Sequence, residues 1–522
     1  MATAFKIVPK EYRDSVSLMQ LSASIAKLPG VEQASAVMAT ENNLALLAEA
    51  GLVVDVTGAG AADLLIAVRG EESALPAALQ EATEKLTRKS SNGTAAQHEA
   101  PKPRSIQMAL AEAGASNMVL ISTPGEYAAA EAMKALRLGL NVMLFSDNVS
   151  EEEELALKRF ARERDLIVMG PDCGTAIING VPLAFANVVK RGPIGAVSAS
   201  GTGLQQVTVL IDRLGSGISQ AVGTGGRDLH HQVGGISMLQ GLKHLAADPG
   251  TQVIVLISKP PAPDVAQRVL SEARKAGKPV VVNFVGADPA MLSGSGVHGA
   301  KTLEDAARAA VELTRGETPQ RSYQEVPPRP VRLPPLGPAQ RYIRGLFSGG
   351  TFCYEAALLL DECLADVYSN TPARTEGELA DLWHSHHHAL IDLGDDVFTR
   401  GRPHPMIDYR LRNERIVREA EDSETAVILL DVVLGYGSHP DPASELAPAL
   451  RRAREAAVRH GGNVIFVGHV CGTEGDPQGL QRQTSALTQA GMVLAPSNAQ
   501  AVRLAASLVS GRAPAKSPPA PL

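Results

Sequence analysis

Two short runs of small and hydroxyl residues are the segments best suited to hold a ligand. AVSASGT (196–202) and LFSGGT (346–351) each follow an apolar, strand-like run and precede a helix-like one. The first N–H groups of a helix are unpaired and partly positive, glycine lets the backbone approach a ligand closely, and Ser or Thr adds a hydroxyl donor. Such turns suit a phosphate or a carboxylate, and ordinary helix capping is the alternative. The candidate anion-binding residues are Ser200, Gly201, Thr202, Gly349, Gly350 and Thr351.

Three loops rich in glycine, proline or charge also follow strand-like runs. They are GPDCG (170–174), GTGGRD (223–228) and DLGDDVFTRGRPHPMID (392–408). The guanidinium of Arg227 suits two-point binding of a phosphate or carboxylate, whereas an Arg–Asp pair on the surface would contribute little. The first loop is equally consistent with a plain turn around a buried cysteine. The residues that these loops offer to a ligand are Asp172, Gly225, Arg227, Arg402 and His404.

Histidine and cysteine offer weaker candidates. HSHHH (384–388) has no carboxylate at ligand spacing, and adjacent residues on an extended chain point in opposite directions. A polar loop is therefore favoured, and no metal site is expected. Cys173 and Cys353 each follow a Gly-rich turn, where a nucleophilic thiol is conceivable. A small buried side chain is the preferred interpretation.

The elements that must position these residues alternate regularly from residue 105 onward. Amphipathic, helix-like stretches separate apolar strand-like runs, and continuous apolar strands with crossover helices are typical of a parallel sheet covered on both faces. These runs are MVLIS (118–122), VMLFS (142–146), LIVMG (166–170), IGAVS (194–198), VIVLIS (253–258) and VVVNFV (280–285). The fold class is therefore α/β.

The last part of the chain repeats the middle part. Gly350 and Thr351 follow Gly201 and Thr202 at a constant spacing of 149 residues, and TQVIVLISKPPAPD resembles TAVILLDVVLGYGSHPD. A repeat of this length predicts two similar sheet domains that pack as a pseudo-symmetric pair. Residues 1–88 alternate differently, in an order that suits a ferredoxin-like α/β plait. A Pro-rich linker over 316–338 separates the two repeats, and the second of the two sheet domains covers 340–511.

Composition excludes several classes of function. The 522 residues carry a formal net charge of −7, so the chain lacks the excess of positive charge that is typical of proteins that bind nucleic acid. No apolar run reaches about 18 residues, the length that a membrane span needs. The first residues, MATAFKIVPKEYRDS, have no apolar signal core, and the four cysteines form no CxxC pair. A cytoplasmic protein is expected.

The motifs GPDCG, GAVSASGT and GTGGRD, with the repeat, resemble the FdrA family within the succinyl-CoA synthetase superfamily. Residues 105–315 resemble the α subunit of that synthetase, as a CoA-binding-like Rossmann domain (105–190) and a flavodoxin-like domain (191–315). Residues 340–510 resemble the carboxy-terminal domain of its β subunit. The resemblance implies that the two helices after the small-residue turns face each other across one phosphate-handling site. His298 in GVHGA (296–300) lies near the place of the synthetase's phosphorylated histidine. Lys259 takes the place of the carboxylate that orients this histidine in the synthetase.

The same resemblance implies a function. The FdrA family is associated with allantoin (ureide) breakdown, which suggests acyl or carbamoyl transfer resembling oxamate carbamoyltransferase, from carbamoyl phosphate to oxamate. The implied catalytic residues are Lys259, Arg227 and His298. An ADP-forming acyl-CoA synthetase that needs an ATP-binding partner is the first alternative, and a non-catalytic scaffold or regulatory subunit is the second. No cofactor is fixed, since CoA and carbamoyl phosphate both stay open. The expected partners are a small anionic substrate and other subunits or copies of the chain. Neither nucleic acid nor a membrane is expected as a partner.

Overall fold

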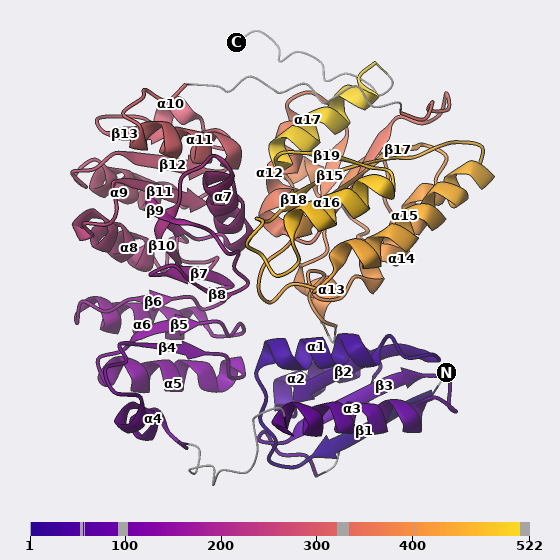
Figure 1. Ribbon diagram of the computed structural model, residues 1–522, viewed down its shortest axis with the longest axis horizontal. Helices are drawn as coiled ribbons and strands as arrows, with labels where there is room; N and C mark the ends of the chain where they lie inside the picture. The colour runs from indigo at the N-terminus through magenta and orange to yellow at the C-terminus, as the bar shows by residue number, and fades with distance from the viewer. Residues whose placement is uncertain are drawn as a thin grey trace. The chain divides into compact units, whose positions relative to one another are not determined.

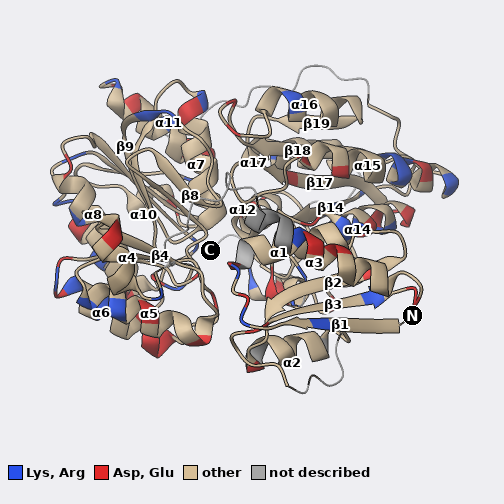
Figure 2. Ribbon diagram, turned by 60° about the horizontal axis from the view of Figure 1, so that its bottom comes forward, with Lys and Arg blue, Asp and Glu red and all other residues tan. Residues whose placement is uncertain are grey.

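The computed structural model describes residues 2–52, 56, 58–91, 103–320, 333–400 and 402–511 (Figure 1). The chain divides into two compact units. The first comprises residues 1–166 and 395–408, and the second 167–394 and 409–522. Figure 2 shows acidic and basic residues interspersed on the helices of both units, as is usual for a protein surface. Within the described ranges, no helix is both long and apolar enough to cross a membrane.

The amino-terminal part is a three-stranded antiparallel sheet in the order β1-β3-β2. Its elements are β1 (Ala2–Val8), α1 (Ser15–Ile25), β2 (Val31–Met38), α2 (Glu41–Glu49), β3 (Leu64–Gly70) and α3 (Leu75–Ser91). Asp14 and Thr40 cap α1 and α2 with their side chains, which explains where these helices begin. This antiparallel α/β unit agrees with the expected plait.

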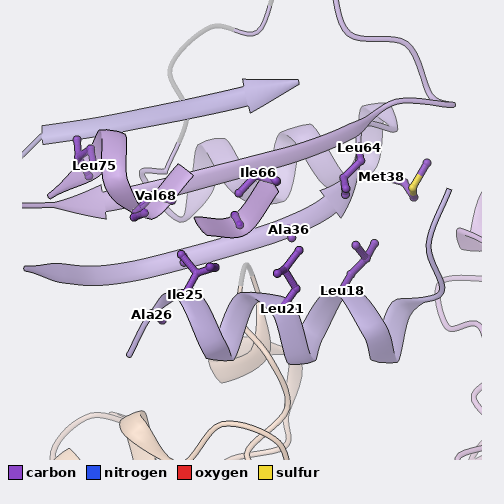
Figure 3. Packing of buried hydrophobic residues seen from close by; sticks show 13 residues of the cluster. Leu18, Leu21, Ile25, Ala26, Ala36, Met38, Leu64, Ile66, Val68 and Leu75 are labelled. Carbon is purple, nitrogen blue, oxygen red and sulfur yellow. The ribbon is translucent and has the colours of Figure 1, made fainter. Parts of the chain in front are cut away.

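Both faces of this sheet are covered, because side chains alternate along β3. Leu64, Ile66 and Val68 pack against α1 and α3, and Figure 3 shows Leu18 and Leu21 of α1 pointing toward this face. The intervening residues of β3, Leu65 and Ala67, belong to a second cluster with residues in and on either side of α2: Ala39, Leu47 and Leu52. The period-2 pattern of one strand therefore builds two cores.

The rest of the first unit begins a parallel arrangement. It contains α4 (Ile106–Ala113), β4 (Met118–Ile121), α5 (Gly125–Arg137), β5 (Asn141–Leu144), α6 (Glu151–Arg162) and α13 (Asp396–Thr399). β4 and β5 pair in parallel over four residues, as the apolar runs there predict. α5 crosses between the two strands and buries alanines such as Ala128 and Ala132.

The first half of the second unit is a seven-stranded sheet in the order β13-β12-β11-β9-β10-β7-β8. Its elements, after β6 (Val168–Met169), are β7 (Thr175–Ile178), β8 (Val181–Ala184), β9 (Arg191–Ser198), α7 (Gly201–Arg213), β10 (Ile218–Gly223), α8 (Ile236–Ala247), β11 (Val253–Ser258), α9 (Pro263–Ala273), β12 (Val280–Phe284), α10 (Pro289–Leu292), β13 (Val297–Gly299) and α11 (Leu303–Thr314). The strands from β9 onward pair in parallel, and β7 joins β10 and β8 antiparallel. Two strands of this sheet thus precede residue 190, where the sequence analysis places a domain boundary.

The second half of this unit is a six-stranded parallel sheet in the order β15-β16-β14-β17-β18-β19. Its elements are β14 (Tyr342–Phe347), α12 (Gly350–Asp361), β15 (Val367–Ser369), the 3-10 helix η1 (Thr375–Gly377), β16 (His388–Asp392), α14 (Arg410–Glu421), β17 (Thr425–Val433), α15 (Pro442–Arg459), β18 (Ile465–Cys471), α16 (Leu480–Gln489), β19 (Met492–Ala495) and α17 (Asn498–Val509). All nine residues of β17 are buried, as continuous apolar strands of a covered parallel sheet require. The α/β fold class with parallel-sheet domains is confirmed.

Each of the two sheets reverses its strand order at one strand. The chain passes from β9 to β10 on one side and to β11 on the other, and it likewise leaves β14 for β15 and β16 on one side and β17 on the other. In open parallel sheets, ligands bind beyond the carboxyl end of the strand where the order reverses. α7 and α12 begin at these two places.

Candidate functional site

The starts of α7 and α12 meet inside the second unit, where Figure 1 draws the two helices side by side. The Ser200 Oγ and Thr351 Oγ1 atoms are 2.6 Å apart. A Cβ atom added to Gly349 would lie 2.9 Å from Thr202 Cγ2, so only glycine allows this close approach. We call Ser200–Thr202 and Gly349–Thr351 the facing turns. Two segments that lie far apart in the sequence therefore form one polar junction.

The first facing turn is held by serine side chains. Ser198 Oγ donates to the Ser200 carbonyl at 2.7 Å and accepts from the Ser200 N–H at 3.0 Å. Ser200 Oγ accepts from the Gly203 N–H at 3.0 Å, which caps α7. The capping alternative therefore describes Ser200 correctly, and the same hydroxyl also contacts Thr351.

The second facing turn has no such cap. α12 begins after Gly349 without a side-chain cap, although the Ser348 and Gly349 N–H groups both donate to the Asp431 carboxylate, at 2.8 and 3.0 Å. Asp431 was not a sequence candidate. Its position inside the apolar run TAVILLDVV is the signal that could have revealed it, because a buried carboxylate needs partners.

A positive and a negative side chain lie beside the second facing turn. A Cβ atom added to Gly350 would be 3.5 Å from Lys259 Nζ and 2.4 Å from Asp392 Oδ2. Lys259 directly follows β11, and Asp392 is the last residue of β16. Sequence reasoning singled out Lys259 but missed Asp392, although a carboxylate at the end of an apolar strand marks the same edge of the sheet.

The glycine-rich loops before β7 and after β10 lie against each other near the end of β9. The Thr224 N–H donates to the Ser198 carbonyl at 2.8 Å. Gly225 has φ +85°, and a Cβ there would lie 2.3 Å from the Pro171 carbonyl oxygen, so GTGGRD packs directly on GPDCG. Asp172 is exposed and Arg227 half-buried in these loops.

Asp228 is not the surface residue that the alternative, an Arg–Asp surface pair, assumed. It is fully buried, and its carboxylate accepts from the Ser237 and Met238 N–H groups at 3.1 and 2.8 Å. It thereby caps α8, whose own N-cap residue is Gly235 in the left-handed region.

One candidate residue is not brought to the facing turns. His298 lies on the edge strand β13, opposite Val281, and three strand spacings, about 14 Å, separate that strand from β9. Partial burial lowers the pKa of His298, which favours the neutral imidazole. Arg402 and His404 belong to the first unit, where His404 Nδ1 accepts from the Met406 N–H at 3.2 Å. Their roles stay predictions.

The cysteines and the histidine run behave as structural residues. Burial raises the pKa of the Cys353 thiol to about 12, so it stays protonated and is a poor nucleophile. His388 is fully buried as the first residue of β16, where its Nδ1 accepts from the Ile343 N–H at 3.1 Å. Only His388 differs from the expected polar loop, because the strand begins one residue earlier than its apolar run; residues 384–387 lie in the loop before it. Among the described residues, no group of three potential ligands could hold a metal ion.

An anion would favour the starts of α7 and α12 over those of α8, α9, α11 and α15. α7 and α12 have no acidic residue in their first turn. α9, α11 and α15 each carry at least one, and Asp228 covers the start of α8. A carboxylate already present at a helix start uses the local N–H groups and repels a second anion. The start of α12 shares part of this effect, because Asp431 accepts from the Gly349 N–H and Asp392 lies beside Gly350.

Coenzyme A, one of the ligands left open by the sequence, carries a diphosphate, and the helix starts after β4 and β5 do not suit it. A Cβ atom at Gly125, the first residue of α5, would lie 2.3 Å from the Asp147 carbonyl oxygen, so backbone acceptors already cover this start. α6 begins with four glutamates and a capping box between Ser150 and Glu153. Backbone acceptors and negative charge both disfavour a phosphate there.

Comparison with protein-family models gives three matches. Residues 1–103 match the amino-terminal heavy metal-associated domain of AllF, residues 190–286 a CoA-binding domain, and residues 346–508 a CoA-ligase domain. The last two matches each include one of the facing turns.

Similar proteins extend over the whole chain or over its middle part. The uncharacterised protein YahF of Escherichia coli K12 is 44% identical over 513 residues, which are 98% of this chain and 99% of YahF. Subunit alpha-2 of the mitochondrial ADP-forming succinate–CoA ligase of Trichomonas vaginalis is 29% identical over 33% of this chain and 57% of that subunit. This chain thus covers less than two thirds of the ligase subunit. Among solved structures, an acetyl-coenzyme A synthetase of Candidatus Korarchaeum cryptofilum covers 76% of this chain and 84% of its own, with 15% identity and a TM-score of 0.31.

Proposed function

This chain belongs to the FdrA family, within the succinyl-CoA synthetase superfamily, and on that premise we propose that it is a subunit of a transferase that handles a phosphate at the facing turns. The group transferred is an acyl or carbamoyl group. The match to AllF supports a place in allantoin breakdown. Carbamoyl phosphate and oxamate are the substrates that we propose from the resemblance to the FdrA family.

The contact between Ser200 and Thr351 carries this proposal. Two helix starts without acidic residues in their first turns converge there, and Lys259 lies beside one of them. The N–H groups of the helix starts, hydroxyls and one ammonium group together suit a phosphate, and the Asp392 carboxylate beside Gly350 is the charge that opposes it.

In the proposed reaction, the facing turns and Lys259 hold the phosphate that departs from the carbonyl carbon. The nitrogen of the acceptor attacks that carbon, the bond to the phosphate oxygen breaks, and the proton of that nitrogen passes to the departing phosphate. The negative charge that develops on the phosphate meets groups that are already oriented. Such preorganised donors usually contribute the largest part of catalysis, and holding two small reactants together adds to it. Arg227 would supply further positive charge from the GTGGRD loop.

Binding of matched ligands tests the proposal. Carbamoyl phosphate and acetyl phosphate differ by an amino group in place of a methyl group, and oxamate and pyruvate differ in the same way. We expect phosphate and carbamoyl phosphate to raise the melting temperature of the full chain, and Lys259→Ala to abolish the rise. Lys275→Ala, which removes an exposed lysine just after α9, is the matched control. Equal responses of Lys259→Ala and the wild type would refute the site.

Acyl-CoA ligation with an ATP-binding partner is the second candidate, favoured by the CoA-binding and CoA-ligase matches. Isotopically labelled ATP, CoA and small acids, supplied with candidate partner subunits, would then give a CoA thioester and labelled protein. Absence of both products would exclude this activity. A purely scaffolding role predicts that no small anion changes the melting temperature at all.

A further inference from the structure

A fully buried ion pair lies directly behind the second facing turn. Arg412 of α14 donates through Nη1 to Asp431 Oδ1 and to the Asp431 carbonyl oxygen, both at 2.9 Å. Both side chains are 0% exposed. The Arg412 guanidinium carbon also lies 4.6 Å from the centre of the Tyr409 ring, which fixes its orientation further.

The Asp431 carboxylate holds the chain just before α12 begins. It accepts from the Ser348 N–H at 2.8 Å, from Ser348 Oγ at 2.7 Å and from the Gly349 N–H at 3.0 Å. These bonds fix the two residues that precede the helix. The next N–H groups, from Gly350 onward, belong to the first turn of α12 and are oriented as a consequence.

A lone carboxylate in this place would work against the proposed site. A buried negative charge behind a helix start cancels the partial positive charge there and repels an incoming anion. The guanidinium of Arg412 compensates that charge, so Asp431 can act as a hydrogen-bond acceptor without an electrostatic penalty to the ligand.

The first facing turn is built without such a pair. The repeat aligns Ile257 of TQVIVLIS with Asp431 of TAVILLDV, and Ile257 lies opposite Ser198 in the sheet. There the hydroxyl of Ser198 closes the turn instead. The fold of this turn therefore does not require a buried ion pair, which points to a role that belongs to the second turn alone.

We propose that Arg412 and Asp431 are positioning residues for the anion at the facing turns: Asp431 fixes the start of α12, and Arg412 keeps that fixed start electrically open to a phosphate. This inference rests on the proposed function. Neither residue touches the ligand.

The experiment compares two arginines of the same helix in the full chain. Arg415 is also buried, and it pairs with Glu419 at 2.5 Å, away from the turn. Arg412→Met and Arg415→Met should both lower the melting temperature. Calorimetric titration with inorganic phosphate, at a temperature where circular dichroism shows both folded, should give a Kd weakened about tenfold or more for Arg412→Met alone. Arg412→Lys, which keeps the charge, should recover part of the affinity. Equal affinity in Arg412→Met and Arg415→Met overturns the proposal.

Hydrogen exchange separates this inference from the proposed function. If the wild type does not bind phosphate, the proposed function fails, and the exchange of the segment 346–356 still tests the positioning. Arg412→Met should accelerate exchange in that segment more than Arg415→Met does. Unchanged exchange would show that the pair does not fix the start of α12.

Discussion

Single charged side chains decide what the facing turns can bind. Lys259, just after β11, and Asp392, at the end of β16, both lie beside Gly350. One comes from each half of the second unit. Each compensates part of the other's charge, so the junction is not strongly polarised by either alone. A phosphate with two negative charges would compete with Asp392 for Lys259, and the helix starts would supply the remaining attraction.

His469 should make the second unit sensitive to acid. It is fully buried, neither ring nitrogen has a partner, and burial lowers its pKa to about 3. The unfolded chain binds the proton below about 6.5, so stability falls as the pH drops from 6.5 toward 3. The difference in free energy of unfolding between His469→Leu and the wild type should be more favourable to the variant at pH 5 than at pH 8, by about 2 kcal/mol.

Thermal melts of both proteins at the two pH values measure this gain. His460→Gln, at an exposed position after α15, is the control and should show no pH-dependent difference. A His469→Leu variant that follows the wild type at both pH values would disprove the assignment.

Glu355 should have the opposite dependence on pH. It is buried in α12, accepts from the Leu303 N–H and Asn498 Nδ2, and burial raises its pKa to about 7. Between pH 4.5 and about 7, Glu355 is protonated in the folded state and ionised in the unfolded chain. The free energy of unfolding therefore falls as the pH rises from about 4.5 to 7. Glu355→Gln should be more favourable, relative to the wild type, at pH 8 than at pH 5, as calorimetric melts would record. An equal difference at both values contradicts the raised pKa.

At the scale of elements, the packing of α7 against α12 depends on missing side chains. We expect Gly349→Ala to force the facing turns apart, because the new Cβ would lie 2.7 Å from Phe352 Cδ2 and 2.9 Å from Thr202 Cγ2. The melting temperature and the phosphate affinity should both fall. Gly250→Ala, whose Cβ would meet no atom closer than 3.4 Å, is the matched control. A tolerated Gly349→Ala would mean that the helix starts are not in tight contact.

The sequence predicts elements better than it predicts their polar supports. Apolar runs such as VIVLIS placed β11 correctly, and the repeat of Gly-Thr placed the starts of α7 and α12. Asp431 escaped notice because its partners at Ser348 lie 83 residues away, and such contacts leave no local spacing to recognise. Asp228 was misjudged for a related reason, since capping a helix from outside needs the folded loop.

At the scale of the whole molecule, Arg213 links the two sheets of the second unit. From the last residue of α7, its Nε donates to the Gly472 carbonyl at 2.9 Å and its Nη2 to the Val470 carbonyl at 2.6 Å. Arg213→Ala would leave these carbonyls without their donor, at a cost of about 3 kcal/mol or more. We expect the calorimetric transition of this unit to shift to lower temperature, with Arg164→Ala, an exposed residue, as the control. No shift would show that the interface does not depend on this contact.

Backbone carbonyls carry no sequence signature, so this link could not be read from the repeat. The repeat did indicate that two similar domains would pack together, because duplicated folds often keep complementary surfaces. Which faces meet is decided by contacts such as those of Asn187 with Asp476 and Glu304 with Ser497.

The hydroxyl contact between Ser200 and Thr351 joins two halves that one chain carries. Their association is therefore intramolecular, with an effective concentration that does not change on dilution. A ligand bound at the junction would touch both halves at once, so its binding energy would tighten their docking as well as fill the site. Loss of ligand and loosening of the two halves should accordingly be one thermodynamic event.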